Sequence, residues 1–197
     1  AHNNMKNTLL LKIDMEQLLY ERNQILKENR ELERRSEIEE FTNVMNKTAF
    51  RTHVSAELET MHQDQYVCLL VIDIDKFKSI NDTFGHLVGD QVLLHVVKVL
   101  KEVLRSSDFI GRIGGDEFCV FMKNILSLPY LYERLDEILD RLVNTRIEDR
   151  QVLSASIGVC MSNHICRYDE IFQKADEAMY HAKHAGGNCY DITELST

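Results

Sequence analysis

The sequence predicts a layered α/β (α+β) fold, in which helices flank a sheet, and three patterns in its 197 residues carry this prediction. Residues 66–72 form a near-continuous apolar run, which is typical of a strand buried on both faces. Residues 109–122 hold two β-prone runs joined by glycines, which predicts a hairpin. Amphipathic helical periodicity recurs around residues 92–100, 130–144 and 169–184.

Ahead of this domain, residues 8–36 contain no Gly or Pro. An apolar residue recurs there every seven residues, at Leu11, Leu18, Ile25 and Leu32. This spacing predicts the d positions of a parallel two-stranded coiled coil, whose a positions are Met15, Arg22, Asn29 and Ser36. A single amphipathic helix packed on its own domain is the alternative. We therefore divide the chain into a dimerising helix at 1–37 and a domain at 38–197.

The remaining elements follow in chain order. A helix is expected over residues 47–61, then the buried strand at 66–72, a helix around 92–100 and the hairpin at 109–122. A second amphipathic helix follows at 130–144, and the alternating, β-branched residues 151–161 predict another strand. The last helix spans 169–184 and ends at two glycines that can cap it, and residues 190–192 are expected to add an edge strand.

Composition excludes several classes of protein. Hydrophobic residues make up 44% and charged residues 28% of the chain, the balance of a globular domain. The formal net charge of −9 argues against a broad nucleic-acid surface, so an anionic nucleotide would need a metal and local cations. No apolar run approaches the roughly 18 residues of a membrane span.

Five cysteines form no CxxC pair, and three lie in apolar runs, which predicts buried free thiols in a reducing cytoplasm. We expect a cytoplasmic domain. The first residue, Ala1, suggests a piece of a longer protein, so an upstream sensor domain is expected and membrane attachment of the full-length protein stays open.

The richest stretch is Gly-Arg-Ile-Gly-Gly-Asp-Glu-Phe at residues 111–118. Two glycines make a turn whose bare N–H groups a phosphate can approach, and two carboxylates follow at its mouth. Carboxylates beside a phosphate site suit Mg²⁺. An ordinary solvated hairpin turn is the alternative for this stretch taken alone.

This stretch resembles the signature loop of the GGDEF family, the diguanylate cyclases, and the resemblance runs from roughly Glu39 to Asn188. It implies a nucleotide-cyclase-like fold with a central, mostly antiparallel sheet. It also implies an enzyme that condenses two GTP molecules into cyclic di-GMP and two pyrophosphates. The implied metal is Mg²⁺ or Mn²⁺, held by Asp73, the Ile74 carbonyl, Asp116 and Glu117, and the three acids are the implied catalytic residues.

The resemblance also assigns the nucleotide contacts. Asn81 and Asp90 would bind guanine, since a carboxylate accepts from guanine N1–H and N2–H₂ and an amide adds a complementary bond. Phosphates would be held by backbone N–H groups near Lys76 and Phe77, by Gly114 and Gly115, and by the ammonium groups of Lys78 and Lys183. Taken alone, Asn81 would more simply be a turn former.

Arg105 and Asp108 match the family's RxxD site, at which product inhibits the enzyme, although a surface salt bridge would also explain them. Two departures stand out. Asn43 replaces a glycine in the segment that leads into the domain, and Gly187 replaces an arginine that would help hold the terminal phosphates.

The resulting prediction is a product-inhibited diguanylate cyclase that acts as a homodimer. One alternative is a catalytically silent receptor that binds GTP or cyclic di-GMP. A more distant one is a different Mg²⁺-dependent nucleotide cyclase or phosphotransferase.

Overall fold

The structure is a computed structural model, and it describes residues 15–27, 32, 37–62, 65–147 and 151–195. Internal contacts divide the chain into two compact units, Ala1–Ile38 and Glu39–Thr197. In the first unit, residues 15–27 are helical, as predicted for this stretch. Met15, Leu18 and Ile25 are all more than half exposed there, whereas Leu11, Asn29 and Ser36 lie outside the described residues. The coiled-coil dimer therefore stays a prediction.

The second unit is built on a seven-stranded sheet with the strand order β1-β2-β4-β5-β3-β8-β9. Its strands are β1 (Ile38–Glu39), β2 (Val44–Asn46), β3 (Val67–Ile74), β4 (Phe109–Arg112), β5 (Glu117–Met122), β8 (Ala155–Ser162) and β9 (Cys189–Glu194). The three central pairs are antiparallel, and the outer pairs β2–β4 and β8–β9 are parallel. The predicted sheet with a mostly antiparallel centre is confirmed.

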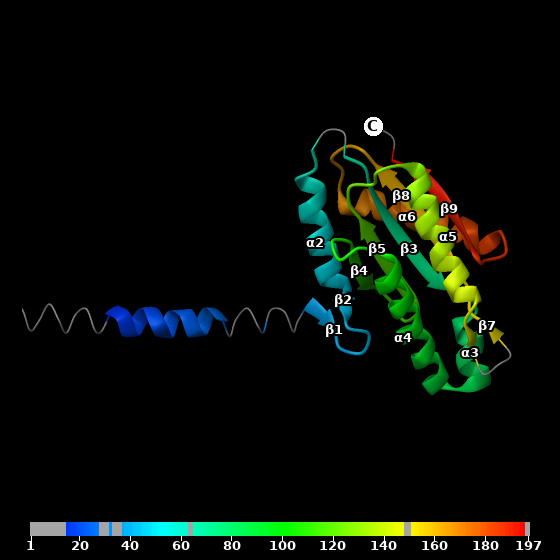
Figure 1. Cartoon of the computed structure of the whole chain (residues 1–197), viewed down its shortest axis with the longest axis horizontal. Coiled ribbons are helices and arrows are strands. Elements are labelled where there is room, and N and C mark those ends of the chain that lie inside the picture. Colours follow the sequence, from blue (N-terminus) through cyan, green and yellow to red (C-terminus); the bar gives the residue numbers. More distant parts are fainter. Residues whose placement is uncertain (1–14, 28–31, 33–36, 63–64, 148–150, 196–197) are drawn as a thin grey trace, which may run out of the picture. The chain divides into compact units, whose positions relative to one another are not determined.

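Helices cover both faces of this sheet (Figure 1). They are α2 (Lys47–Glu59), α3 (Phe77–Phe84), α4 (His86–Val103), α5 (Leu128–Val143) and α6 (Tyr168–His184). Alternate residues of β3 point to the two faces: Leu70 and Ile72 join the core with α4 and α5, and Leu69 and Val71 join the core with α2 and α6. All eight residues of β3 are buried, which is why the strand reads as a continuous apolar run.

Helix α6 lies unusually close to β8 because of Gly158. A Cβ added at this glycine would lie 2.0 Å from both the Ala175 carbonyl oxygen and the Met179 nitrogen, which are backbone atoms of α6. Only a residue without a side chain allows this approach. The position of α6, which carries Lys183, therefore depends on a glycine in the neighbouring strand.

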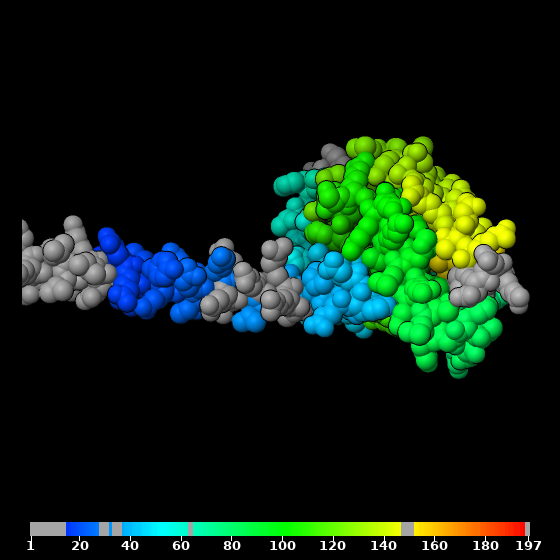
Figure 2. All heavy atoms as spheres, turned by 60° about the horizontal axis from the view of Figure 1, so that its bottom comes forward, coloured from blue at the N-terminus to red at the C-terminus, as the bar shows by residue number. Residues whose placement is uncertain are grey.

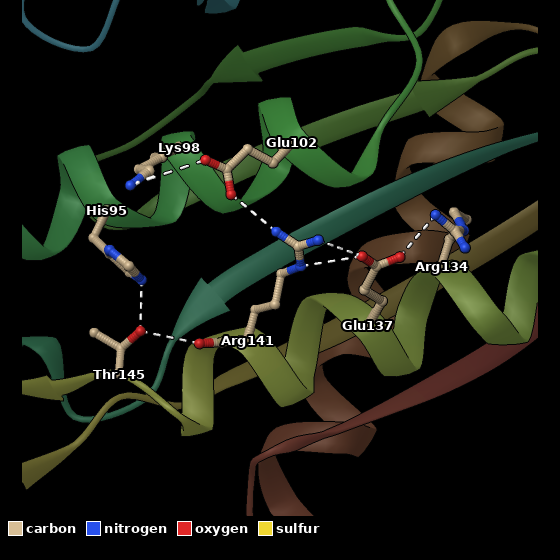
Figure 3. A network of polar contacts seen from close by, with 7 residues as sticks. All are labelled: His95, Lys98, Glu102, Arg134, Glu137, Arg141 and Thr145. Atoms are coloured by element: carbon tan, nitrogen blue, oxygen red, sulfur yellow. Dashed lines mark hydrogen bonds and ion pairs between the residues drawn. The ribbon is translucent and has the colours of Figure 1, made fainter.

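The helices α4 and α5 are joined at their surface by a chain of ion pairs (Figure 3). Arg141 lies 2.9 Å from Glu102 and 2.6 Å from Glu137, and Glu137 lies 2.7 Å from Arg134. Next to this chain, His95 Nε2 and Thr145 Oγ1 are 2.6 Å apart. Half-exposed pairs of this kind contribute little individually, so the network mainly fixes which side chains face each other.

The segment that leads into the domain makes a tight turn onto α4. Asn43 has a φ of 54°, in the left-handed region that Asn tolerates better than most residues, so the departure from glycine is accommodated. The Lys101 ammonium of α4 donates to the Asn43 carbonyl at 2.8 Å, and Figure 2 shows this turn in light blue beside the green atoms of α4.

Several predicted boundaries need correction. Asp73 lies within β3 and not beyond its end, because the strand continues through Ile74. The single strand predicted at 151–161 is broken into β7 (Gln151–Val152), which pairs with β6 (Arg146–Ile147), and β8. The helix α3 and the short strands β1, β2 and β6 were not predicted. The edge strand β9 is confirmed and is longer than predicted. Among the described helices, none combines the length and apolarity that crossing a bilayer requires.

Candidate active site

Three acids gather where β3 ends and β5 begins, next to the glycine turn. Asp73 of β3 is the cross-strand partner of Glu117 of β5, so their backbones are neighbours. The Ile74 N–H donates to the Asp116 carbonyl at 3.3 Å, which ties the second acid of the turn to the same strand. The sequence placed these acids on separate elements, and the antiparallel register brings them together.

The electrostatics of this cluster favour a bound cation. Burial raises the pKa of Asp73, and Asp116 and Asp75 add to the rise, while the Lys183 ammonium, 2.7 Å from Asp73 Oδ1, opposes it. Burial and the charges of Asp73 and Asp116 likewise raise the pKa of Glu117. Carboxylates that repel each other in this way are relieved by a metal ion, so the donor set fits Mg²⁺ or Mn²⁺.

The side chains do not form a complete metal cage by themselves. Among the described residues, no group of three or more His, Cys, Asp or Glu side chains is arranged to hold an ion. Mg²⁺ commonly binds through one or two carboxylates and takes its remaining ligands from water and substrate phosphates, so it does not require a complete set of side-chain ligands.

The backbone of the glycine turn is hydrogen-bonded to the first residue of β5, and the space beside Gly115 is open. The N–H groups of Ile113 and Gly114 donate to the Glu117 carbonyl at 3.0 and 3.4 Å. A Cβ on Gly114 would lie 2.7 Å from Glu117 Oε2, so this glycine makes room for the carboxylate. Gly115 has nothing within 4 Å of a Cβ, which leaves space for a phosphate to approach its backbone.

Arg112 connects this turn to the segment that leads into the domain. Its guanidinium donates to the Gly115 carbonyl at 3.2 and 2.7 Å and lies 3.5 Å from the Glu39 carboxylate. Glu39 in turn accepts from the N–H of Thr42 at 2.8 Å and from its hydroxyl. Sequence reasoning missed the pairing of Arg112 with Glu39 because these two residues are far apart in the chain.

Three of the predicted phosphate contacts, Lys76, Phe77 and Lys78, lie at the start of α3, just after β3. Lys76 has a φ of 57° and precedes the first helical residue, Phe77, so the backbone N–H groups near them belong to the start of α3. The side chains of Lys76 and Lys78 are exposed, and Phe77 packs against the core. Lys183 arrives from the end of α6 on the other face.

The two residues predicted to bind guanine come from adjacent helices. Asn81 lies in α3 and not in a turn, and its Oδ1 is buried without a hydrogen-bond partner among the described residues. That oxygen lies 1.9 Å from where a Cβ of Gly89 would be, so α4 can approach only because residue 89 is glycine. Asp90, the next residue of α4, is exposed. An orphaned buried acceptor beside an exposed carboxylate is a fitting place for an N–H-rich base edge.

The predicted product site differs in detail from the expectation. Asp108 is buried, and its carboxylate accepts from the N–H of Arg105 at 3.0 Å and of Lys123 at 3.4 Å, so it caps a tight turn. Burial raises the pKa of Asp108, although these two hydrogen bonds act to lower it. The exposed Arg105 guanidinium lies 4.4 Å from the centre of the Tyr130 ring, a cation–π contact and not a salt bridge with Asp108.

Arg134 is a second cation at this place that the sequence did not reveal. Its guanidinium lies 5.6 Å from the centre of the same Tyr130 ring, and its Nε is buried without a partner among the described residues. Figure 3 shows one of its other nitrogens paired with Glu137, one turn along α5, and the remaining nitrogen lies 3.0 Å from Glu133. No local signal distinguishes it from any other arginine on an amphipathic helix.

The fold and this site together define a class: layered α/β domains whose acidic strand end faces a phosphate-accessible glycine turn. Comparison with known proteins identifies the family within this class. The chain belongs to the GGDEF family, because residues 36–189 match the family described as "Diguanylate cyclase, GGDEF domain".

Curated relatives and solved structures agree with this assignment. The probable diguanylate cyclase DgcC of Escherichia coli K12 is 38% identical over 160 residues, covering 77% of this chain and 42% of that protein. DgcT of the same organism is 35% identical over 153 residues, covering 75% and 34%. The coiled coil and GGDEF domain of DgcB from Caulobacter crescentus, solved with c-di-GMP, superposes with a TM-score of 0.78 at 26% identity and covers 94% of this chain and 99% of that one. The chain thus spans less than half the length of these two curated relatives.

Proposed function

We propose that this chain is a diguanylate cyclase domain that converts two GTP molecules into cyclic di-GMP and two pyrophosphates. The acid cluster of Asp73, Asp116 and Glu117 beside the glycine turn is the observation that carries the proposal. Each 3′-hydroxyl oxygen forms a bond to the α-phosphorus of the other nucleotide, the bond from that phosphorus to the bridging oxygen of the β-phosphate breaks, and the hydroxyl proton is released. Such phosphoryl transfer depends on positioning and charge neutralisation more than on covalent help from the protein.

Asp73, Asp116, Glu117 and the Ile74 carbonyl would hold Mg²⁺ or Mn²⁺. A bound divalent cation neutralises charge on the phosphates and helps activate the attacking oxygen. The backbone of Gly114 and Gly115, the start of α3 and the ammonium groups of Lys78 and Lys183 orient the phosphates. Asn81 and Asp90 select guanine, because adenine presents an acceptor at N1 and would leave Asp90 unpaired.

Each domain holds one GTP, so two domains must face each other for the reaction. The exposed apolar residues Met15, Leu18 and Ile25 support a homodimer, which would raise the effective concentration of the two domains. A Leu18→Asp, Ile25→Asp variant is expected to lose activity mainly at low protein concentration. Full activity of a proven monomer would refute this part of the proposal.

Product inhibition acts through Arg105, with Asp108 holding the turn that presents it. Tyr130 braces Arg105 from one side, and Arg134 supplies a second guanidinium to the same surface. Cyclic di-GMP carries two phosphates and two guanines, which arginines bind by bidentate hydrogen bonds and by stacking.

The first test is to strip co-purified nucleotide, incubate the chain with GTP and Mg²⁺ and separate the products by chromatography. Cyclic di-GMP and pyrophosphate are expected, and Glu117→Gln should abolish turnover while product binding through Arg105 persists. No product at high protein concentration, with cyclic di-GMP still bound, would instead favour a receptor. The glycine at residue 187, which brings no cation to the phosphates, is the observation that favours this second function.

A further inference from the structure

The side chain of Asp75 fastens three segments of the domain and is absent from the predicted metal and nucleotide contacts. It follows β3 directly, two residues after Asp73. Its carboxylate accepts from Ser154 Oγ at 2.8 Å, Ser156 Oγ at 2.7 Å and the N–H of Asn188 at 2.9 Å. Its own N–H donates to the Ser154 carbonyl at 2.9 Å. The end of β3, the start of β8 and the turn between α6 and β9 therefore meet at one carboxylate.

The turn after α6 lies directly against this carboxylate because of Gly187. This residue has a φ of +74°, and a Cβ on it would lie 2.7 Å from Asp75 Oδ2. The same turn closes the end of α6, since Gly187 N–H donates to the Ala182 carbonyl at 3.2 Å and Gly186 N–H to the Lys183 carbonyl at 3.4 Å.

These contacts form a closed loop of interactions. Asp75 holds the Asn188 N–H, the adjacent glycines hold the last turn of α6, and the Lys183 ammonium of that turn reaches Asp73 at 2.7 Å. Within the part of the chain that the structure describes, Lys183 is the single cation in contact with the acid cluster. Lysine is a flexible point charge, so the place where it acts depends on how firmly its backbone is held.

We infer that Asp75 is a positioning residue for Lys183: it fixes the turn after α6 so that the ammonium is directed at the metal and phosphate site. The inference rests on the proposed function in so far as Lys183 binds GTP phosphates. Residue 187 is glycine and supplies no second cation, so the proposed role falls on Lys183 and, through it, on Asp75. Asp75 itself is not one of the proposed substrate contacts.

The test compares Asp75→Ala, Lys183→Met and the double variant by calorimetric binding of Mg²⁺ with a GTP analogue whose α–β bridge cannot be cleaved. Because Lys183→Met loses a charged hydrogen bond, its affinity for the analogue is expected to fall about tenfold or more. Asp75→Ala is expected to weaken binding about three- to tenfold, and the double variant should bind no more weakly than Lys183→Met alone. Multiplying effects in the double variant, or an unchanged affinity of Asp75→Ala, would overturn the inference.

A second measurement needs no nucleotide. Amide hydrogen exchange of residues 183–188 should speed up in Asp75→Ala, because the turn loses its anchor. Unchanged exchange there would overturn the inference. If Asp75→Ala speeds exchange but the wild-type protein does not bind the analogue, Asp75 still holds the turn after α6, and it is the proposed function that is refuted.

Two further variants separate positioning from general stability. Ser156→Ala removes a donor to Asp75, and Ser162→Ala removes an equally buried hydroxyl of β8 that contacts His164 instead. Only Ser156→Ala should speed exchange at residues 183–188 and lower the affinity for the analogue. Equal effects of both variants would overturn the inference. Asp75→Asn should recover part of the affinity, since hydroxyls can rotate to accept from an amide. Should Asp75→Ala fail to fold, Ser156→Ala and Asp75→Asn carry the test.

Discussion

Replacing Gly158 by alanine is expected to displace α6, the helix that carries Lys183. The added methyl would start 2.0 Å from two backbone atoms of α6, whereas ordinary contact begins at 3.4 Å. The helix or the strand must therefore move by about 1.4 Å, since backbone atoms cannot rotate away as a side chain does.

Overpacking of a close-packed core costs about 1–3 kcal/mol, and a backbone clash belongs at the upper end of that range. For a domain of this size, about 3 kcal/mol lowers the Tm by about 6–12 °C. The affinity for the uncleavable GTP analogue should fall as well, because Lys183 lies one turn beyond Met179 and moves with it.

Thermal unfolding of the purified chain measures the first effect and calorimetry the second. Gly115→Ala is the control for stability, because nothing lies within 4 Å of the added Cβ and its Tm should stay within about 2 °C of the wild type. A Tm of Gly158→Ala equally close to the wild type would refute the claim that this glycine sets the position of α6.

In metal-free buffer, Glu117→Gln should raise the Tm above neutral pH, because burial and neighbouring acids raise the pKa of Glu117 and its ionised form costs stability. The gain should vanish below the ordinary value of 4.5, and the exposed Glu40→Gln should show no such trend. Arg112→Met should lower kcat about tenfold or more and leave cyclic di-GMP affinity nearly unchanged, whereas an equal loss of both would contradict a role in aligning the turn. Gly187→Ala should lower the free energy of unfolding by about 1–3 kcal/mol in urea, and by more than Gly115→Ala, which has neither a positive φ nor a neighbour within 4 Å. A smaller loss at residue 187 would argue against the clash.

The sequence predicted the elements whose patterns are long. The run at residues 66–72 and the hairpin at 109–122 were recognisable because continuous burial leaves few polar residues in a strand. The helix α3 was missed because its eight residues are too few to show a helical period, and Asn81-Asp82 looks like a turn. The strands β1, β2 and β6 are two or three residues long, too short for any alternation to appear.

The candidate site shows the same division. Asp73, Asp116 and Glu117 could be proposed because a family motif places them, and the structure brings their backbones together. Asp75, Arg112 and Arg134 could not, since what distinguishes them is a partner or an orphaned atom seen only after folding. The Asn188 N–H that Asp75 holds, for example, is 113 positions away. Long-range pairing of this kind leaves no local pattern in a sequence.

The parallel pairing of β2 with β4 gives the domain a mechanical property. Met45 is paired with Gly111 and Asn46 with Arg112, so β2, which lies between β1 and α2 in the chain, runs alongside the strand that leads to the glycine turn. A force pulling the chain at residue 38 would load the β1–β2 pairing and then these hydrogen bonds before it reached α2. Tension applied ahead of the domain would therefore reach the strand beside the glycine turn before it reached most of the sheet.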